Sequence, residues 1–311
     1  MLDRHDLDGV VVSVWNSAHY EIARVVLERR LHLLLEKPMA LKASHARKLI
    51  DIAENNNCQI IMSYPWQFIE MSRRVREVVA HGSLGLIHYI SNTFSSEPLY
   101  LYRGDDRADD PSMASAYPVH GPGDVYSDPK RSGGGQGHLQ ITHSAALMFF
   151  LTSARAAHVT ALMNNLDVPV DVADAIAVRM DNGCLATIGS TGAVTHSEGK
   201  LDLQLYGTKG WIDLDYIEST GTIYHADGKV EALKTNPQLY AGQPGSDCPG
   251  SGASYPAHLP SKNLVDVILK RDFNRSPGTY GWRSVELLEA AYQSANQSGL
   301  PVNISSLYEH E

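Results

Sequence analysis

Cysteine is scarce in this chain of 311 residues, which contains only Cys58, Cys184 and Cys248. The three residues are far apart and show no pair spacing. This usage excludes a disulfide-rich scaffold and a zinc site built on a CxxC motif. It is typical of a protein in a reducing compartment, so we expect a cytoplasmic location.

Long apolar runs and basic clusters are also missing. Runs such as 31–35 and 145–151 are far too short to span a bilayer. The charged N-terminal segment MLDRHDLDG has the pattern of neither a signal peptide nor a presequence. Acidic residues outnumber basic ones, 35 against 26, which gives a net charge of −9. We therefore expect no nucleic-acid partner and no binding to a membrane surface.

The first 66 residues alternate between continuous apolar runs and segments with helical spacing. Apolar strands separated by helices predict a parallel sheet covered on both faces, which is an α/β arrangement. Ligands of such sheets bind at the carboxyl ends of the strands. We expect the strands at 10–14, 31–35 and 59–63, and the helices at 19–30 and 44–55.

Residues 67–311 have a different pattern, in which short alternating segments are separated by turns. The turns DNG at 181–183 and GTKG at 207–210 are typical of hairpins. This pattern predicts an α+β domain with an open, mainly antiparallel sheet. We expect its strands at 86–94, 158–163, 173–180, 184–189, 201–206, 211–216 and 221–225, its helices at 71–81, 143–151, 260–270 and 280–297, and long loops at 97–135 and 241–256.

Three segments together carry a family resemblance: VVVSVWNSAHYEIA, HLLLEKPMAL and GGGQGHLQITH. The chain resembles the Gfo/Idh/MocA oxidoreductases over nearly its whole length. The resemblance implies that 1–66 is the remainder of a Rossmann domain that binds NAD or NADP. It implies that 67–311 binds the substrate and mediates assembly into a homo-oligomer, a dimer or a tetramer. It further implies oxidation or reduction of a CH–OH group of a sugar, cyclitol or related small polyol.

Two departures from the family pattern stand out. No glycine-rich dinucleotide-binding turn precedes Val10. By the resemblance, 10–14 is the fourth strand of the sheet, so on the order of 60 residues, about two strand–helix units, are expected before it. The strand would then have an open apolar edge, which favours dimerisation or aggregation. In addition, Leu139 stands where the family usually has an Asp four residues before the histidine, and Trp15 replaces a usual proline.

Lys37 and His143 are the candidate catalytic residues. Oxidation of an alcohol needs a group that takes the hydroxyl proton. A lysine partly withdrawn from water at a strand end has a lowered pKa and can exchange a proton near neutrality. An imidazole is equally suited to this exchange. The simpler interpretations are a surface lysine after a buried strand and a histidine that only caps or packs.

The cofactor is expected to contact the loops that follow the first two strands. Trp15, Asn16 and His19 follow the first strand, although Trp15 could instead pack under the helix. The resemblance implies that Lys37 also binds the nicotinamide ribose and that the Lys37–Pro38 bond is cis. Glu36 is expected to orient this loop.

Substrate contacts are expected from two further places in the chain. Tyr64, Trp66 and Gln67 follow the third strand, where aromatic rings can stack on a ligand, but they could equally belong to the core. His138 and Gln140 follow the glycine run. We expect no metal, because His138 and His143 have no carboxylate near them in the sequence.

Two classes of function remain open at this point. The first is the NAD(P)-dependent dehydrogenase or reductase just described, including a redox-neutral form that holds its nicotinamide tightly. The alternative is a non-catalytic or cofactor-deficient protein that keeps the ligand-binding domain and the oligomer interface. The pair Lys37 and His143 favours the first class, and the missing glycine-rich turn favours the second.

Overall fold

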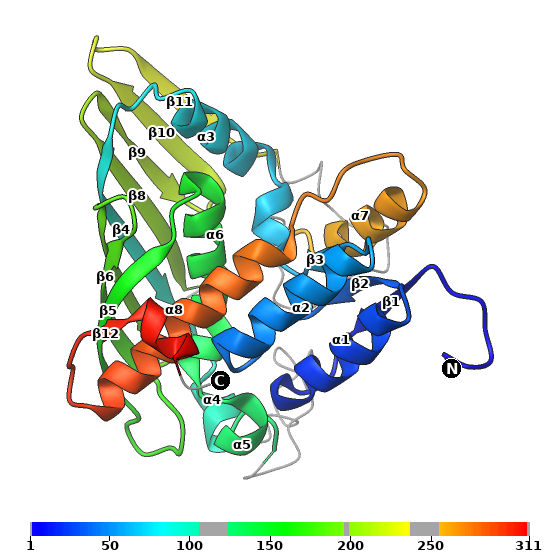
Figure 1. Cartoon of the computed structure of the whole chain (residues 1–311). Coiled ribbons are helices and arrows are strands. Elements are labelled where there is room, and N and C mark those ends of the chain that lie inside the picture. The colour runs from blue at the N-terminus through cyan, green and yellow to red at the C-terminus, as the bar shows by residue number, and fades with distance from the viewer. Residues whose placement is uncertain (1, 106–123, 196–198, 237–254, 310–311) are drawn as a thin grey trace.

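Figure 1 shows the computed structural model, which describes residues 2–105, 124–195, 199–236 and 255–309. The expected loop at 241–256 lies almost wholly outside the described residues, as do Cys248 and the central part of the expected loop at 97–135. The structure contains two sheets.

The first sheet is the expected parallel one, with strand order β1 (Gly9–Val12), β2 (His32–Leu35), β3 (Ile60–Met62). Helices α1 (His19–Glu28) and α2 (Ala43–Asn55) cover one face, and α7 (Leu259–Ile268) contacts all three strands from the other (Figure 1). Leu34 and Ile61 pack on Leu264 of α7, whereas Leu33 and Leu35 belong to the main core. Both faces are buried at β2 and β3, which explains their uninterrupted apolar runs, whereas Val11 of β1, on the α7 face, is 55% exposed.

The second sheet has nine strands and is mainly antiparallel, as expected; β4 and β7 form its one parallel pair among the described residues. Strands β11 and β12 were not expected from the sequence. The order across the sheet is β11 (Val230–Lys234), β10 (Thr220–His225), β9 (Gly210–Asp215), β8 (Lys200–Gly207), β4 (Ile87–Ser95), β7 (Leu185–Thr191), β6 (Ala173–Met180), β5 (Ala156–Asn164), β12 (Val302–Asn303).

Helices cover only one face of the second sheet in the described part of the chain. Figure 1 shows α3 (Glu70–Ala80), α6 (Thr142–Thr152) and α8 (Gly278–Asn296) on that face. Helix α8 contacts β5 and α6 on one side and α2 and β3 on the other. Helix α8 therefore packs against elements of both sheets and connects them.

The described residues also form several short helices. They are η1 (Asn16–Ala18), η2 (Pro65–Phe68), α4 (Leu99–Arg103), α5 (Pro129–Ser132) and η5 (Ile304–Tyr308). A π-helical segment, η3 (Gly137–Ile141), runs directly into α6, so the helix does not open at His143 as expected but begins before it. Within the described ranges, no helix combines the length and apolar character needed to cross a membrane.

Truncating a leucine of α8 that lies in the core tests the role of this helix. Leu287 is fully buried, so we expect Leu287→Ala to lower the free energy of unfolding by about 3 kcal/mol. Leu269 is 49% exposed, and Leu269→Ala should stay within about 0.5 kcal/mol of the parent. Urea titration of the three proteins measures both values. Equal losses in the two variants would contradict the packing described.

Candidate active site

The carboxyl ends of the parallel strands bring Lys37 to the edge of the first sheet. Val12 of β1 pairs with Leu35 of β2, so these strands end at the same level. The backbone N–H of Glu36 donates to the carbonyl of Val12 at 3.0 Å. Lys37 follows, and its Nζ donates to the carbonyl oxygen of Leu139 at 2.8 Å. One hydrogen bond therefore joins the first sheet to a segment 102 residues further along the chain.

The ammonium group of Lys37 is largely withdrawn from water. Burial lowers the pKa of Lys37 to about 8, and the carboxylate of Glu36 opposes this effect. Oε2 of Glu36 also accepts a hydrogen bond from the backbone N–H of Lys37 at 3.3 Å. The Lys37–Pro38 peptide bond is cis, which confirms the expectation from the family resemblance. Lys37 is therefore mostly protonated at neutral pH and can lose its proton slightly above it.

His143 lies near the start of α6 among aromatic rings. Its ring makes edge-to-face contacts, with centroid separations of 5.8 Å to Tyr64, 5.5 Å to Trp66 and 6.1 Å to Tyr255. Burial, followed by the charge of Lys37, holds the pKa of His143 well below its usual value. The imidazole is thus neutral at pH 7. Tyr255 was not anticipated from the sequence.

The three residues expected after β3 have different surroundings. Tyr64 and Trp66 both touch the imidazole just described, and the Tyr64 hydroxyl forms a hydrogen bond with Oγ1 of Thr142 at 3.1 Å. Burial raises the pKa of Tyr64 to about 12, so the hydroxyl stays protonated. Gln67 is buried, and its Nε2 donates to the carbonyl of Ala146 at 3.4 Å. Gln67 therefore packs against α6.

His138 and Gln140 stand on either side of Leu139 in η3, so both lie next to the carbonyl that accepts from Lys37. His138 is buried and stacks on Tyr292, with ring centroids 4.9 Å apart. Burial lowers the pKa of His138 to about 4, against the opposing charge of Asp171. Gln140 is half-buried.

Several buried polar atoms in this region have no hydrogen-bond partner among the described residues. They include Nδ1 of His143, Nε1 of Trp66 and both ring nitrogens of His138. Buried polar atoms in folded proteins nearly always have a partner, and leaving one unpaired costs about 1–3 kcal/mol. A ligand with several hydroxyl groups would supply partners for these atoms.

Trp15 and Asn16 extend from the end of β1 toward the segment before the glycine run. Trp15 is 52% exposed, and the guanidinium of Arg131 lies 6.0 Å from its ring centroid. Nδ2 of Asn16 donates to the carbonyl of Ser132 at 2.8 Å. The exposed indole and the neighbouring amide therefore lie together at the carboxyl end of β1.

His19 faces inward. Its Nδ1 lies 2.6 Å from the carbonyl oxygen of Pro38, and its Nε2 lies 3.0 Å from that of Val14. Burial lowers the pKa of His19. Because a neutral imidazole has a single N–H, it donates to one of these two carbonyl groups. His19 thus holds two strand-end loops together, and its ring nitrogens face the backbone.

Asp171, which the sequence analysis missed, organises the glycine-rich segment. Its Oδ1 accepts from the N–H of Gly135 and its Oδ2 from the N–H of Gly137, both at 2.7 Å. The Tyr292 hydroxyl donates to Oδ1 at 2.8 Å. The backbone carbonyl of Asp171 accepts from the N–H of Gln136 at 2.9 Å. Three consecutive backbone N–H groups are thereby engaged by one residue, so they are not available to hold a phosphate group.

Asp174 of β6 is a second buried acid near Asp171. Burial, and then the charge of Asp171, raise the pKa of Asp174 to about 9, so it is protonated at neutral pH. The sequence contained a signal for this residue. The alternating pattern predicted the strand at 173–180, and Asp174 lies on the same inward face of that strand as Ile176 and Val178.

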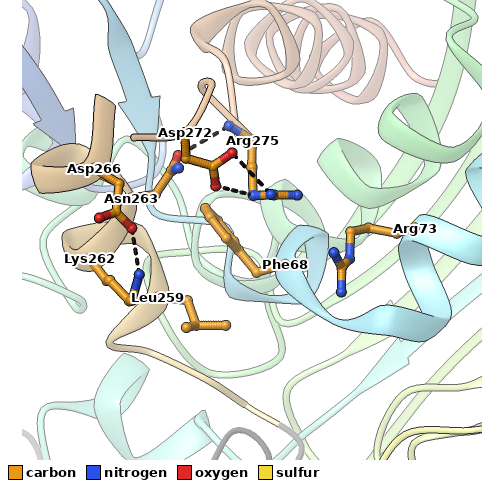
Figure 2. A pocket seen from close by; sticks show the side chains of 8 residues that line it. All are labelled: Phe68, Arg73, Leu259, Lys262, Asn263, Asp266, Asp272 and Arg275. Carbon is orange, nitrogen blue, oxygen red and sulfur yellow. Dashed lines mark hydrogen bonds and ion pairs between the residues drawn. The ribbon is translucent and has the colours of Figure 1, made fainter. Parts of the chain in front are cut away.

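A surface cleft lies apart from the catalytic candidates. Within the described ranges no three potential metal ligands cluster. A cleft of about 220 Å³ lies between the segment 68–73 and α7 (Figure 2). Four of the five charged side chains that line it form two ion pairs, Lys262–Asp266 and Arg275–Asp272, and the fifth is Arg73. The catalytic candidates do not line this cleft.

Two family models match the chain. One, described as "Oxidoreductase family, NAD-binding Rossmann fold", covers residues 1–64, and the other, described as "GFO/IDH/MocA C-terminal domain", covers residues 72–213. Among curated proteins, D-xylose 1-dehydrogenase (NADP(+)) 2 of Haloferax volcanii is 24% identical over 191 residues. That alignment covers 61% of this chain and 52% of the relative, so the chain spans about half of the relative's length.

Solved structures share the fold over almost the whole chain. An oxidoreductase domain protein from Kribbella flavida superimposes with a TM-score of 0.80 at 18% identity, covering 97% of this chain and 82% of that one. A levoglucosan dehydrogenase in complex with NADH and levoglucosan gives a TM-score of 0.75 at 17% identity, covering 97% and 81%. At these identities the likeness establishes the fold.

Removing the ionisable group of Asp174 tests the buried acid pair. At neutral pH Asp174 is protonated in the folded chain. In the unfolded chain it is ionised, because pH 7 lies above the usual pKa of an aspartate. Folding at neutral pH therefore takes up a proton. We expect Asp174→Asn to raise the free energy of unfolding at pH 7 by about 2 kcal/mol. The gain should shrink as the pH falls toward 4, because Asp174 of the unfolded chain then begins to be protonated as well.

Denaturant titrations between pH 4 and pH 8 measure this difference. Asp167→Asn is the matched control, because Asp167 is exposed and paired with Arg103, and its loss should bring no gain. A pH-independent difference between the parent and Asp174→Asn would contradict a neutral Asp174.

Proposed function

The chain belongs to the Gfo/Idh/MocA oxidoreductase family, and we propose that it is an NAD(P)-dependent oxidoreductase acting on a CH–OH group of a sugar, cyclitol or related small polyol. The observation that carries the proposal is the ammonium group of Lys37, held at the carboxyl edge of the parallel sheet with a pKa of about 8. A neutral His143 on α6 lies close enough for the Lys37 charge to lower its pKa.

Lys37 is the proposed general base in the oxidation direction. An ammonium group has three N–H bonds, and only one is donated to Leu139, which leaves the others for the substrate and cofactor. Once deprotonated, the amine can take the proton of the reacting hydroxyl. Its pKa near 8 keeps both protonation states accessible in a neutral cell, so that the same group returns the proton in the reverse direction.

The strand-end loops fit a nicotinamide cofactor in their chemistry. The exposed ring of Trp15 can stack on an aromatic ring, and Asn16 and Lys37 are polar groups beside it. We propose that these residues hold NAD or NADP together with Glu36 and Pro38, while His19 supports the loops from inside. When bound, the cofactor accepts or supplies the hydride at the substrate carbon.

A hydroxyl-rich substrate matches the other side of the site. His143 is neutral, and its unpaired Nδ1 can exchange a hydrogen bond with a substrate hydroxyl. Nε1 of Trp66 is a free donor of the same kind, and the rings of Tyr64 and Trp66 can pack against the apolar face of a sugar ring. His138 and Gln140 are proposed to complete the contacts from η3.

A non-catalytic binding protein is the less favoured reading. Burying an ammonium group beside two imidazoles lowers stability, because each charge or unpaired polar atom loses its hydration. A protein that only binds a partner through its sheet gains nothing from this arrangement. The grouping of Lys37, His138 and His143 therefore supports an enzyme.

The outer face of the nine-stranded sheet supports the proposal of a homo-oligomer, a dimer or a tetramer. A groove of about 420 Å³ lies on this face, with Tyr89 and His158 among its lining residues. Leu185 lines it too and is 45% exposed, and Leu162 of β5 is 62% exposed. Exposed apolar surface of this kind marks association sites.

The free Cys58 and Cys184 support a cytoplasmic location.

Replacing the proposed base tests the activity. Lys37→Met keeps the side-chain length and removes the amine, so we expect kcat for NAD(P)-dependent oxidation across a polyol panel to fall by about 10³-fold. Lys48→Met, at an exposed position of α2, is the control and should retain activity. The parent's kcat/KM for oxidation should rise with pH and level off above about pH 8. Full activity of Lys37→Met would overturn the proposal.

Placing a charge on the outer sheet face tests the oligomer. We expect the parent to elute as a dimer or tetramer, and Leu185→Asp to shift it toward the monomer, because the carboxylate would be buried unpaired in the interface. Leu269→Asp, at a similarly exposed position next to α7, should leave the assembly intact. Size-exclusion chromatography with light scattering measures the mass. A monomeric parent would rule out the proposed interface.

A further inference from the structure

We propose that Asp171 is a positioning residue for Lys37 and acts through the glycine-rich segment that it holds. The inference rests on the proposed function in that Lys37 is taken as the proton-exchanging group. Asp171 precedes β6 of the second sheet, and its side chain contacts the segment 135–137, Tyr292 and the protonated Asp174. Its influence on the amine is therefore indirect.

The first link is the close approach of the glycine-rich segment to Asp171. The two carboxylate oxygens accept from Gly135 and Gly137, and the backbone carbonyl accepts from the residue between them. A Cβ on Gly135 would lie 2.0 Å from the backbone oxygen of Asp171, and one on Gly137 would lie 2.5 Å from the hydroxyl of Tyr292. The glycines therefore permit contact with this acid.

The second link runs from the held glycines to the acceptor of Lys37. Gly137 is the first residue of η3, and Leu139 follows two residues later. The N–H of Leu139 donates to the carbonyl of Gly135 at 2.9 Å, and its own carbonyl accepts from Nζ of Lys37. Because so few residues separate the clamped N–H groups from this carbonyl, a shift at Asp171 moves the Lys37 acceptor.

Asp171 is itself rigidly held. Its neighbours Val170 and Val172 are buried in a small apolar cluster, and the N–H of Val172 donates to the carbonyl of Asn164 at 2.9 Å. Tyr292 of α8 adds its hydroxyl to the carboxylate. The acid is therefore a fixed point against which the glycine-rich segment is placed.

The charged and titratable groups that bear on Lys37 come from several elements. Glu36 belongs to its own loop, His19 to α1, His138 to η3 and His143 to α6. The charge of Asp171 bears on His138 directly. A useful test must therefore separate removal of this charge from displacement of the carbonyl.

Two variants make that separation. Asp171→Asn removes the charge and one of the paired acceptors, whereas Gly135→Ala pushes against the same contact and changes no charge. In both we expect the midpoint of Lys37 titration to fall by about one pH unit, the shift that corresponds to losing one hydrogen bond to a charged group. The controls are Asp167→Asn, an exposed acid, and Gly189→Ala, where a Cβ would meet nothing within 4 Å.

The readout is the NMR titration of protein labelled with [ε-¹³C]lysine, with the Lys37 signal assigned by its loss in Lys37→Arg. A folded Asp171→Asn or Gly135→Ala variant that keeps the parent's Lys37 midpoint would overturn the inference, even if its activity fell. If Asp171→Asn does not fold, Gly135→Ala decides; if neither folds, Asp171 is structural and the assignment fails. The titration needs no substrate, so absence of turnover would count against the proposed function alone.

Discussion

The hydrogen bond from Nζ of Lys37 to the carbonyl of Leu139 is the contact on which the proposed active site depends. It brings together a loop of the parallel sheet and the π-helical start of α6, which is packed against the second sheet. A lysine without this acceptor would bury an ammonium group with little compensation. A loop of the first sheet and the start of α6 are thus held together at the proposed site, because a backbone carbonyl of one accepts a hydrogen bond from the ammonium group of the other.

The carboxylate of Glu36 acts on the pKa of Lys37, whereas several other titratable groups around Lys37 are neutral at pH 7. Burial keeps His138 and His143 in the neutral form, and it keeps Asp174 protonated. Three buried or half-buried groups remain charged near the reacting region: Lys37 itself, Glu36 beside it, and Asp171, whose carboxylate accepts hydrogen bonds from the backbone and from Tyr292. In such an interior a change in one charge is felt strongly by its neighbours, which suits proton exchange coupled to hydride transfer.

The sequence predicted the parts of the site that follow recognisable local patterns. Lys37 follows one apolar run, and Trp15 and Asn16 follow another. Because ligands of parallel sheets bind at the carboxyl ends of the strands, the sequence predicted that these residues lie at one edge of the sheet. His143 could be located from the glycine run and the helical spacing after it. Asp171 and Tyr292 could not be located in this way, because their contacts with Gly135 and Gly137 join segments that are far apart in the chain. The hydrophobic periodicity of one segment does not indicate which distant segment it contacts. For His19 the sequence predicted the place after the first strand but not the direction of the side chain. Its ring points inward because its nitrogens lie next to the carbonyl groups of Val14 and Pro38.

The measurement that tests the central claim most directly is a fluorescence titration of the purified chain with NADH and with NADPH. The proposed function predicts saturable binding of at least one of them at micromolar concentration, with energy transfer from tryptophans of the site, and weaker transfer in Trp15→Phe. A folded chain that binds neither reduced cofactor would contradict the assignment of the strand-end loops as a nicotinamide site.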